Sequence, residues 1–371
     1  MLAKKSSPFK VVVHTLALSL WFAAGSAMAA TSENGLSDDA RFWQIVCHDF
    51  ATWDFNHDGQ IDVDEVDAAV QLPTIKGADA AALSAIKVFL RGEAKKDDGI
   101  ESFTLDDLCP TDASGQKTKV GKSLVSLFTG YCKKISRESP TLFADGKPHI
   151  ESIRQGRTGD CYFVATVGGL AYHDPAKLKS LIATNGDGSY TVTFPHRRPI
   201  VVPAPTDSEI ACYSDAGADG YWLHVLEKAY AMFKNRTAGK EEALDTVIHG
   251  GSGGRMLMFV TGNVCERYPT ATTNDLLLRQ HLNEAMIANK VVNTGTTGHC
   301  LTVLGFDPVS DQITIWNPWG TSKFYDTAGV KMHDGVFTLG FNDFEHRFVS
   351  LLIEGDRPAT SKDYNKSKHH K

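Results

Sequence analysis

The sequence predicts an α+β protein in which a small, helical and acidic N-terminal unit precedes a larger unit of helices and strands. Residues 37–53 place apolar side chains at helical spacing. Residues 298–306 and 312–317 instead read as two strands on either side of a Pro-containing turn. The 371 residues are 42% hydrophobic and 22% charged, a composition that allows a sizeable buried core.

Residues 1–29 have the pattern of a secretory signal peptide. Lys4, Lys5 and Lys10 form a basic start, an apolar run follows, and Ala27 and Ala29 give a small-residue cleavage site. A membrane anchor is the alternative, but the apolar run is shorter than the ~18 residues that a span needs. We therefore expect an exported protein, periplasmic or extracellular, whose mature chain does not span a membrane.

Charge divides the rest of the chain. Residues 31–112 hold 18 acidic and 6 basic residues, net −12, whereas residues 113–371 hold 26 acidic and 29 basic residues, net +3. This asymmetry predicts an acidic domain at 30–112, a connecting segment at 113–139 and attraction between the two halves. It also predicts a basic tail at 357–371. The overall charge of −6 gives no support to a nucleic-acid partner.

An acidic loop at residues 54–65 predicts a calcium site. Its sequence, Asp-Phe-Asn-His-Asp-Gly-Gln-Ile-Asp-Val-Asp-Glu, fits the EF-hand loop pattern at every fixed position. Gly59 lies where the backbone must turn sharply, and an acidic surface turn is the weaker alternative. A second loop at 95–107 fits in no register, so we expect it to pair structurally without strong binding. The predicted Ca²⁺ ligands are Asp54, Asn56, Asp58, Gln60 through its carbonyl, Asp62 and Glu65.

Seven cysteines in an exported chain leave one unpaired if six form disulfides. Cys47 and Cys109 bracket the acidic domain, and their pairing would stabilise it by roughly 4 kcal/mol in the chain-entropy account. Cys161 is expected to be the free thiol. The other four cysteines allow three pairings, and the last of them could instead be a buried thiol; they are Cys132, Cys212, Cys265 and Cys300.

Cys161 follows a glycine-containing loop and begins an apolar run that predicts a helix. A helix N-terminus favours the thiolate, so this position predicts a nucleophile with a lowered pKa. A buried or disulfide-bonded structural cysteine is the alternative.

The hairpin around Pro308 supplies the partners of a nucleophile. Folding it about Pro308 pairs residues whose numbers sum to 616, so that His299 faces Asn317. An imidazole and a carboxamide then meet at the open end of an apolar face. A polar pair at the rim of a sheet is the alternative interpretation.

These segments resemble the active-site blocks of the calpain family of cysteine proteases. The matching blocks are Gln-Gly-Arg-Thr-Gly-Asp-Cys-Tyr at 155–162, Gly-His at 298–299 and Asn-Pro-Trp-Gly at 317–320. The resemblance implies a papain-like fold with a helical subdomain at 140–249 and a β-rich subdomain at 250–356. It implies a nucleophile at Cys161, a proton carrier at His299 and an orienting amide at Asn317. Gln155 would contribute to the oxyanion hole and Trp319 would shield the imidazole.

The resemblance also has departures. Ser152 stands where family members with calcium in the catalytic core carry an acidic ligand, and the acidic domain precedes the protease region instead of following it. We expect a secreted, calcium-binding cysteine endopeptidase of bacterial type acting on protein or peptide substrates. The alternatives are a non-catalytic, protein-binding relic with a calcium module and a thiol acyltransferase. The intact Cys, His, Asn and Gln set disfavours the relic. The sequence does not indicate an oligomeric state.

Overall fold

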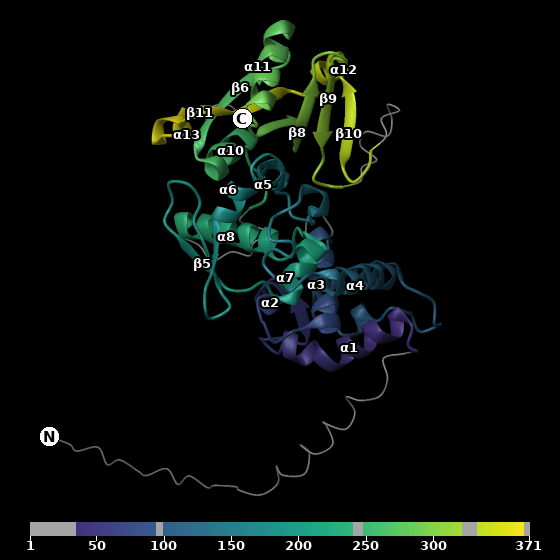
Figure 1. The fold of residues 1–371 in the computed structure, drawn as a ribbon. Helices are drawn as coiled ribbons and strands as arrows, with labels where there is room; N and C mark the ends of the chain where they lie inside the picture. The colour runs from purple at the N-terminus through teal and green to yellow at the C-terminus, as the bar shows by residue number, and fades with distance from the viewer. Residues whose placement is uncertain (1–34, 94–98, 240–247, 321–331, 367–371) are drawn as a thin grey trace, which may run out of the picture.

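The computed structural model describes residues 35–93, 99–239, 248–320 and 332–366. Within them an N-terminal helical unit, a central helical region and a C-terminal sheet follow one another along the molecule (Figure 1). This mixture of helices and sheets agrees with the α+β prediction. The helices in the described ranges include none long and apolar enough to cross a membrane. The expected signal peptide at 1–29 lies outside the described residues.

The N-terminal unit contains the predicted helix and acidic loop. Ser37 caps the first helix by accepting a hydrogen bond from the backbone N–H of Ala40, so the helix expected at 37–53 is confirmed. Two short strands of this unit pair antiparallel, with Ile61 opposite Phe103. Its elements are α1 (Asp38–Trp53), β1 (Gln60–Asp62), α2 (Val63–Ala69), α3 (Gly77–Glu93), β2 (Ser102–Thr104) and α4 (Lys119–Arg137).

The segment predicted to connect the two halves, 113–139, folds mainly as α4. Leu124, Phe128 and Tyr131 lie on one face of this helix and pack into the same core as α1 and α3. Their spacing of three or four residues is the helical period, which puts them on a single stripe. The segment is therefore part of the N-terminal unit and not an extended linker.

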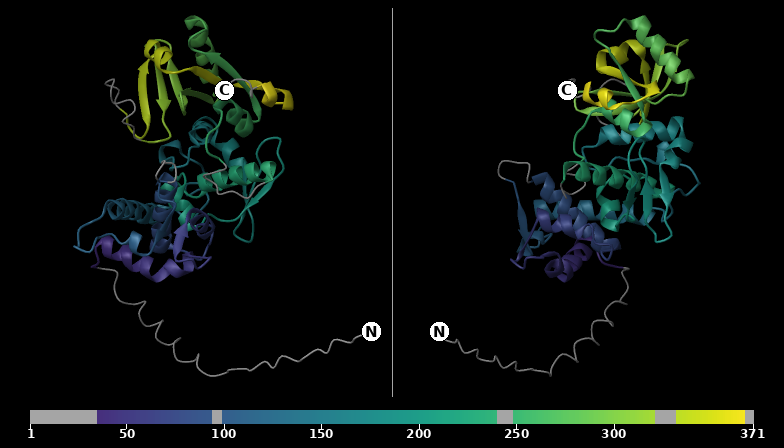
Figure 2. Two further views of the ribbon diagram at one scale, coloured as in Figure 1. Left: turned by 180° about the vertical axis from the view of Figure 1, so that it is seen from behind. Right: turned by 90° about the vertical axis from the view of Figure 1, so that its left-hand side faces the viewer.

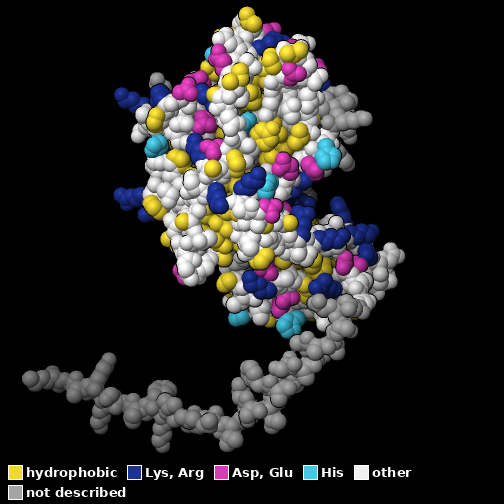
Figure 3. All heavy atoms as spheres, in the orientation of Figure 1, with side chains coloured by type: hydrophobic (Ala, Val, Ile, Leu, Met, Phe, Trp, Pro, Cys, Tyr) yellow, Lys and Arg dark blue, Asp and Glu magenta, His cyan; other side chains and the backbone are white. Residues whose placement is uncertain are grey.

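One ion pair across the predicted boundary at residue 112 has the opposite polarity to the one expected from net charge, and two further pairs join α4 to the central region. Lys76 pairs with Asp207 at 3.0 Å, and Lys134 and Arg137 pair with Asp215 at 3.2 and 2.9 Å. Lys and Arg side chains gather over α4 beside a hollow between the two parts (Figure 3). Lys76 of the acidic half thus pairs with an acidic residue of the other half, because local placement outweighs the summed charge of a domain.

The central region surrounds the helix that begins with Cys161. Two turned views show it between the N-terminal unit and the C-terminal sheet (Figure 2). A three-stranded antiparallel sheet in the order β3-β4-β5 contacts the longest helix of this region. The elements are α5 (Cys161–His173), α6 (Pro175–Ser180), β3 (Ile182–Thr184), β4 (Tyr190–Val192), β5 (Ile200–Val202), α7 (Asp207–Cys212) and α8 (Trp222–Ala238).

The C-terminal region is a six-stranded sheet in the order β10-β9-β8-β7-β11-β6, whose neighbouring strands are antiparallel. Leu301 and Val303 pack on one face with α11 and α12, whereas Cys300 and Leu304 lie in the core that contains α5 and α10. The elements are α10 (Gly253–Thr261), β6 (Asn263–Pro269), α11 (Asp275–Ile287), β7 (Val292–Thr296), β8 (His299–Asp307), β9 (Gln312–Trp316), β10 (Val336–Gly340), α12 (Phe341–Arg347), β11 (Ser350–Pro358) and α13 (Ser361–Lys366).

The predicted register of the β8–β9 hairpin is wrong by two residues near the active site. Asp307 pairs with Gln312, so the turn is wider than predicted, and a register shift between Val303 and Gly305 then brings Val303 opposite Ile315. The numbers of paired residues therefore sum to 618 beyond this irregularity. Because 618 and 616 differ by an even number, the prediction still placed the side chains on the correct faces.

Two further expectations differ from the structure. The predicted Cys47–Cys109 disulfide is not formed, since both side chains are free thiols. They lie near enough for Cys109 to be the second cause, after burial, that raises the pKa of Cys47. The basic tail expected from residue 357 also begins with ordered structure, because Arg357 makes two hydrogen bonds to Asp363 of α13, at 2.9 and 2.7 Å.

Candidate active site

Cys161 is the first residue of α5, as predicted, and the loop before it is held against the C-terminal region. The backbone N–H of Gln155 donates to the carbonyl of Pro318 at 2.9 Å. The backbone of Cys300 lies close enough to lower the pKa of the Cys161 thiol, against the larger effect of burial. The nucleophile candidate therefore contacts β8 at the residue directly after His299.

The pair predicted from the hairpin is present. His299 Nε2 and Asn317 Oδ1 lie 2.8 Å apart, and the ring of Trp319 stacks on the imidazole with centroids 3.8 Å apart. The backbone N–H of Trp319 also donates to Asn317 Oδ1 at 3.1 Å. Because β9 ends at Trp316, Asn317 reaches the imidazole from the loop after the strand. Trp319 lies in the same loop, where the N–H of Gly320 donates to the carbonyl of Asn317 at 3.0 Å.

The other nitrogen of His299 is the chemically informative atom. Nδ1 is buried and makes no hydrogen bond within the described residues. With Nε2 directed to Asn317, Nδ1 is the atom that can exchange a proton with a thiol. Asn317 fixes this division of roles because its carbonyl oxygen accepts from the protonated Nε2.

The predicted lowering of the Cys161 pKa is wrong in direction. Burial raises the pKa of the Cys161 thiol, although nearby backbone N–H groups act to lower it. Burial also lowers the pKa of His299, against the opposite effect of the Asn317 hydrogen bond. Both shifts favour a neutral thiol beside a neutral imidazole in the resting protein, since desolvation here outweighs the helix N-terminus.

Gln155 lies in the same loop, but its amide is directed into the loop. Nε2 donates to the carbonyl of Thr158 at 2.8 Å and to Asp160 Oδ1 at 3.2 Å, while Oε1 is buried without a partner in the described residues. Gln155 can therefore stabilise an oxyanion only if Thr158 or Asp160 gives up one of the two amide N–H groups, and the bond to Asp160 is the longer.

The loop is also fastened from behind. Arg154 and Asp215 exchange backbone hydrogen bonds of 2.8 and 2.9 Å, and the N–H of Gly156 donates to Ser214 Oγ at 3.3 Å. A Cβ atom on Gly156 would come within 2.5 Å of the Tyr213 backbone, so only glycine fits there. Residues 213–215, which contact α4 of the N-terminal unit, therefore also support the loop that carries Gln155.

Residues 131–329 match the family of calpain cysteine proteases, and this match covers more than half of the chain. The chain belongs to the calpain family. The match includes the four residues predicted for catalysis, which are Gln155, Cys161, His299 and Asn317.

Similarity to individual calpain-family proteins is more distant. The chain is 25% identical to Calpain-13 of Rattus norvegicus over 308 residues, which cover 69% of this chain and 45% of that protein. It is 27% identical to the Calpain-1 catalytic subunit of Bos taurus over 272 residues, which cover 58% and 36%. A calpain-type cysteine protease of Oryza sativa is 29% identical over 263 residues, covering 60% and 12%. The chain thus spans less than half the length of these relatives.

The sequence did not single out two buried carboxyl groups behind the nucleophile. Asp160, directly before Cys161, is fully buried, and Glu227 of α8 is 1% exposed. A signal was available for Glu227, because the residues around it in α8 are apolar and buried. A charged residue on a buried helical stripe needs a specific partner.

The acidic loop at 54–65 lies far from the active site in the chain and has oxygen donors of the type that calcium prefers. Asp54 and Glu65 are only 5% and 7% exposed. Backbone N–H groups orient them: Gly59 donates to Asp54 Oδ2 at 3.0 Å and Asn56 donates to Glu65 Oε1 at 3.1 Å. Gly59 has a φ of +83°, as the sharp turn requires. The residues present therefore fit a calcium ion.

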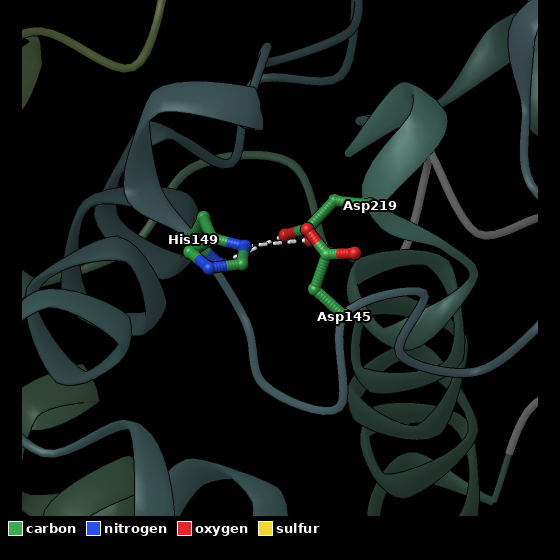
Figure 4. Close-up of side chains that lie close together, drawn as sticks. All are labelled: Asp145, His149 and Asp219. Carbon is green, nitrogen blue, oxygen red and sulfur yellow. Dashed lines mark hydrogen bonds and ion pairs between the residues drawn. The ribbon is translucent and has the colours of Figure 1, made fainter.

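A second group with metal-binding side chains is Asp145, His149 and Asp219 (Figure 4). Asp219 is buried, and it accepts hydrogen bonds from the backbone N–H of His149 at 2.8 Å, from Ser152 Oγ at 3.0 Å and from Trp222 Nε1 at 3.2 Å. His149 Nδ1 lies 2.8 Å from its other oxygen. The carboxylate is thus saturated by protein groups, and the cluster joins the loop before Gln155 to α8.

Proposed function

We propose that this chain is a cysteine endopeptidase in which Cys161 is the nucleophile and His299 carries the proton. The observation that supports it most is the unpartnered Nδ1 of His299, in an imidazole that Asn317 holds by Nε2 and Trp319 covers. This is the arrangement that general acid–base chemistry on a neighbouring thiol requires.

In the proposed reaction, His299 Nδ1 takes the Cys161 proton as the sulfur attacks the substrate carbonyl. The backbone N–H of Cys161 and the side chain of Gln155 stabilise the oxyanion. The imidazolium then gives its proton to the leaving amine, and a thioester remains. Water, activated by the neutral imidazole, hydrolyses the thioester and restores the thiol. Protein or peptide substrates follow from this chemistry.

The test is casein or fluorogenic-peptide hydrolysis together with labelling by an epoxide inhibitor of cysteine proteases. Cys161→Ser is expected to lose at least about 1,000-fold in kcat/KM, because the imidazole does not ionise a serine hydroxyl comparably. The matched control is Cys47→Ser, which alters an exposed thiol remote in sequence from the site and should behave like the parent. Unchanged turnover in Cys161→Ser contradicts the proposal, and amine incorporation without hydrolysis would favour the acyltransferase alternative.

We further propose that the N-terminal unit is an EF-hand-like domain that binds one Ca²⁺ and that the mature protein is exported. Asp54, Asn56, Asp58, Gln60, Asp62 and Glu65 would supply the oxygens, and the ion would neutralise carboxylates that otherwise repel one another. Glu65 and Asp62 form a capping box at the start of α2, which places the last ligand at a defined helix end. N-terminal sequencing of the mature chain tests export, with cleavage expected after Ala29 or Ala30.

A further inference from the structure

The region behind the nucleophile contains two neighbouring buried carboxyl groups. Asp160 and Glu227 lie close enough that each alters the pKa of the other, and both are essentially inaccessible to solvent. Two buried carboxylates this close repel strongly when both are charged. The pair therefore holds at least one proton.

The surrounding hydrogen bonds indicate which residue donates it. Glu227 accepts from Ser214 through both oxygens, from its backbone N–H at 3.1 Å and its hydroxyl at 3.0 Å. Asp160 Oδ1 accepts from Gln155 at 3.2 Å, but Asp160 Oδ2 is buried and receives no hydrogen bond from other N–H or hydroxyl groups in the described residues. A proton on Glu227 that points to Asp160 Oδ2 satisfies this last acceptor.

The groups that face the pair do not replace that proton. Cys161, Tyr162 and Tyr230 face Asp160 from α5 and α8. His224 faces Glu227 and lies 3.3 Å from a carboxylate oxygen of Glu138 on its other side. Burial raises the pKa of Asp160 and that of Glu227, which agrees with a protonated pair.

We propose that Glu227 donates a shared proton to Asp160 and that this carboxyl pair positions the Gln155 amide for the reaction at Cys161. The proposal rests on the function proposed above for those two residues. With the proton in place, Asp160 is a weaker acceptor for Gln155 Nε2, and the amide N–H can turn to the oxyanion as it forms. Without the proton, Asp160 retains the Gln155 N–H and the oxyanion loses a donor.

The test compares two replacements of Glu227. Glu227→Gln keeps the length, an N–H donor for Asp160 and an oxygen for Ser214, so it should keep kcat within about threefold of the parent. Glu227→Met has similar length but no donor, and should lower kcat at least about tenfold with little change in KM, since loss of an oxyanion donor acts on the transition state. Glu284→Met on α11, at an exposed side chain, is the control.

A double-mutant cycle separates positioning from simple support of the fold. In a Gln155→Ala background, Glu227→Met should cost little more, because the residue through which it acts is already absent. An equal loss in both backgrounds, or equal activity of Glu227→Gln and Glu227→Met, overturns the proposal.

Infrared difference spectroscopy tests the proton itself without using peptidase activity. The parent should show a protonated-carboxyl band that persists to about pH 8, well above ordinary carboxyl pKa values, and that is lost in Glu227→Gln. Absence of that band, or its presence unchanged in Glu227→Gln, overturns the shared proton. A parent chain with this band but without peptide hydrolysis would instead contradict the proposed function.

Discussion

At the scale of single residues, the active site depends on which nitrogen of the His299 imidazole is bonded to Asn317. Asn317 orients His299, and its removal should affect both the rate and the pH dependence. The Asn317 hydrogen bond raises the pKa of His299 against the larger lowering by burial. Its loss therefore lowers that pKa further.

We expect Asn317→Ala to reduce kcat by about tenfold to a hundredfold, less than loss of the nucleophile, because the imidazole remains but is poorly oriented. His299 must be neutral to accept the thiol proton, so activity falls as pH drops through its pKa. The acid limb of kcat/KM should lie below about pH 6.5 in the parent and at still lower pH in the variant. Asn342→Ala, exposed on α12, should leave the profile unchanged; a limb that moves upward in Asn317→Ala would contradict this account.

The residues of the site were predictable from sequence to different degrees. Cys161 could be found from the glycines before it and the apolar helix after it, and His299 from strand alternation. Asn317 was paired with His299 through a register that the structure corrects, since Asn317 lies in the loop after β9. The pKa of Cys161 could not, because its direction depends on how deeply the thiol is buried. The contact between Asp160 and Glu227 joins a loop and a helix separated by more than 60 residues, and no local pattern reports such a contact.

At the scale of elements, the position of Cys161 depends on how closely α5 approaches the sheet. Gly168 of α5 faces Trp316 of β9, and a Cβ atom at this position would lie 2.5 Å from the indole ring. Trp316 is fully buried and belongs to the same core. The helix can therefore rest against the strand only if residue 168 has no side chain.

Gly168→Ala should destabilise the protein by about 1–3 kcal/mol, the usual range for overpacking a core, and should lower kcat by displacing Cys161 relative to β8. Gly130→Ala is the matched control, because this helical glycine of α4 is exposed and has open space where its Cβ would lie. It should be stabilising by about 0.5–1 kcal/mol. Urea unfolding with activity measurements compares the two, and equal stabilities would show that α5 can move without cost.

Elements with a strong local pattern were also the ones that the sequence predicted. α1 and α5 begin where their capping residue or loop indicated, and the two hairpin strands lie where alternation placed them. The pairing of β11 with both β6 and β7 joins distant segments and has no such signature. The hairpin register was missed because a wide turn and a bulge each shift it, and neither alters the apolar alternation within the strands.

At the scale of the whole molecule, the segment from α7 to Asp215 connects the N-terminal unit to the catalytic loop. Asp207 accepts from the backbone N–H of Gly77 at 2.8 Å, and Thr206 Oγ1 donates to the carbonyl of Val70 at 2.6 Å. Lys134 donates to the carbonyls of Ala211 and Tyr213. The same segment bonds to residues 154 and 156 of the catalytic loop, so the two units share a support.

Asp215→Ala should test this connection, because it leaves the largely buried Lys134 without its carboxylate. We expect a loss of about 3 kcal/mol in the free energy of unfolding, as for a broken buried ion pair, together with lower kcat. Asp39→Ala breaks the ion pair with Lys117, which is more exposed than the Lys134–Asp215 pair, and should cost less than about 1 kcal/mol with no effect on kcat. Chemical denaturation measures both, and a normal kcat in Asp215→Ala would show that the catalytic loop does not depend on this support.

The proposed calcium ion would act on the same connection. Asp54 and Glu65 are buried beside α1 and α2, whose cores are continuous with α3 and α4. A ligand that binds only the folded state stabilises it, by about 2.7 kcal/mol when its concentration is 100 times Kd. Because α3 and α4 contact α7, this stabilisation should extend to the catalytic region as a single unfolding transition.

Glu65→Gln removes the carboxylate expected to supply two oxygens while keeping the side-chain volume. Its calcium affinity should fall at least about tenfold, and calcium should no longer raise its melting temperature. Asp64→Asn changes a neighbouring exposed carboxylate that is not a predicted ligand, so it should bind like the parent. Titration and scanning calorimetry with calcium or chelator measure both quantities.

The activity of the same variant separates two roles of the ion. If activity at low calcium falls with the melting temperature, the ion acts through the α7 connection. If only stability changes, the ion is a structural element. Parent-like calcium binding by Glu65→Gln would refute the site.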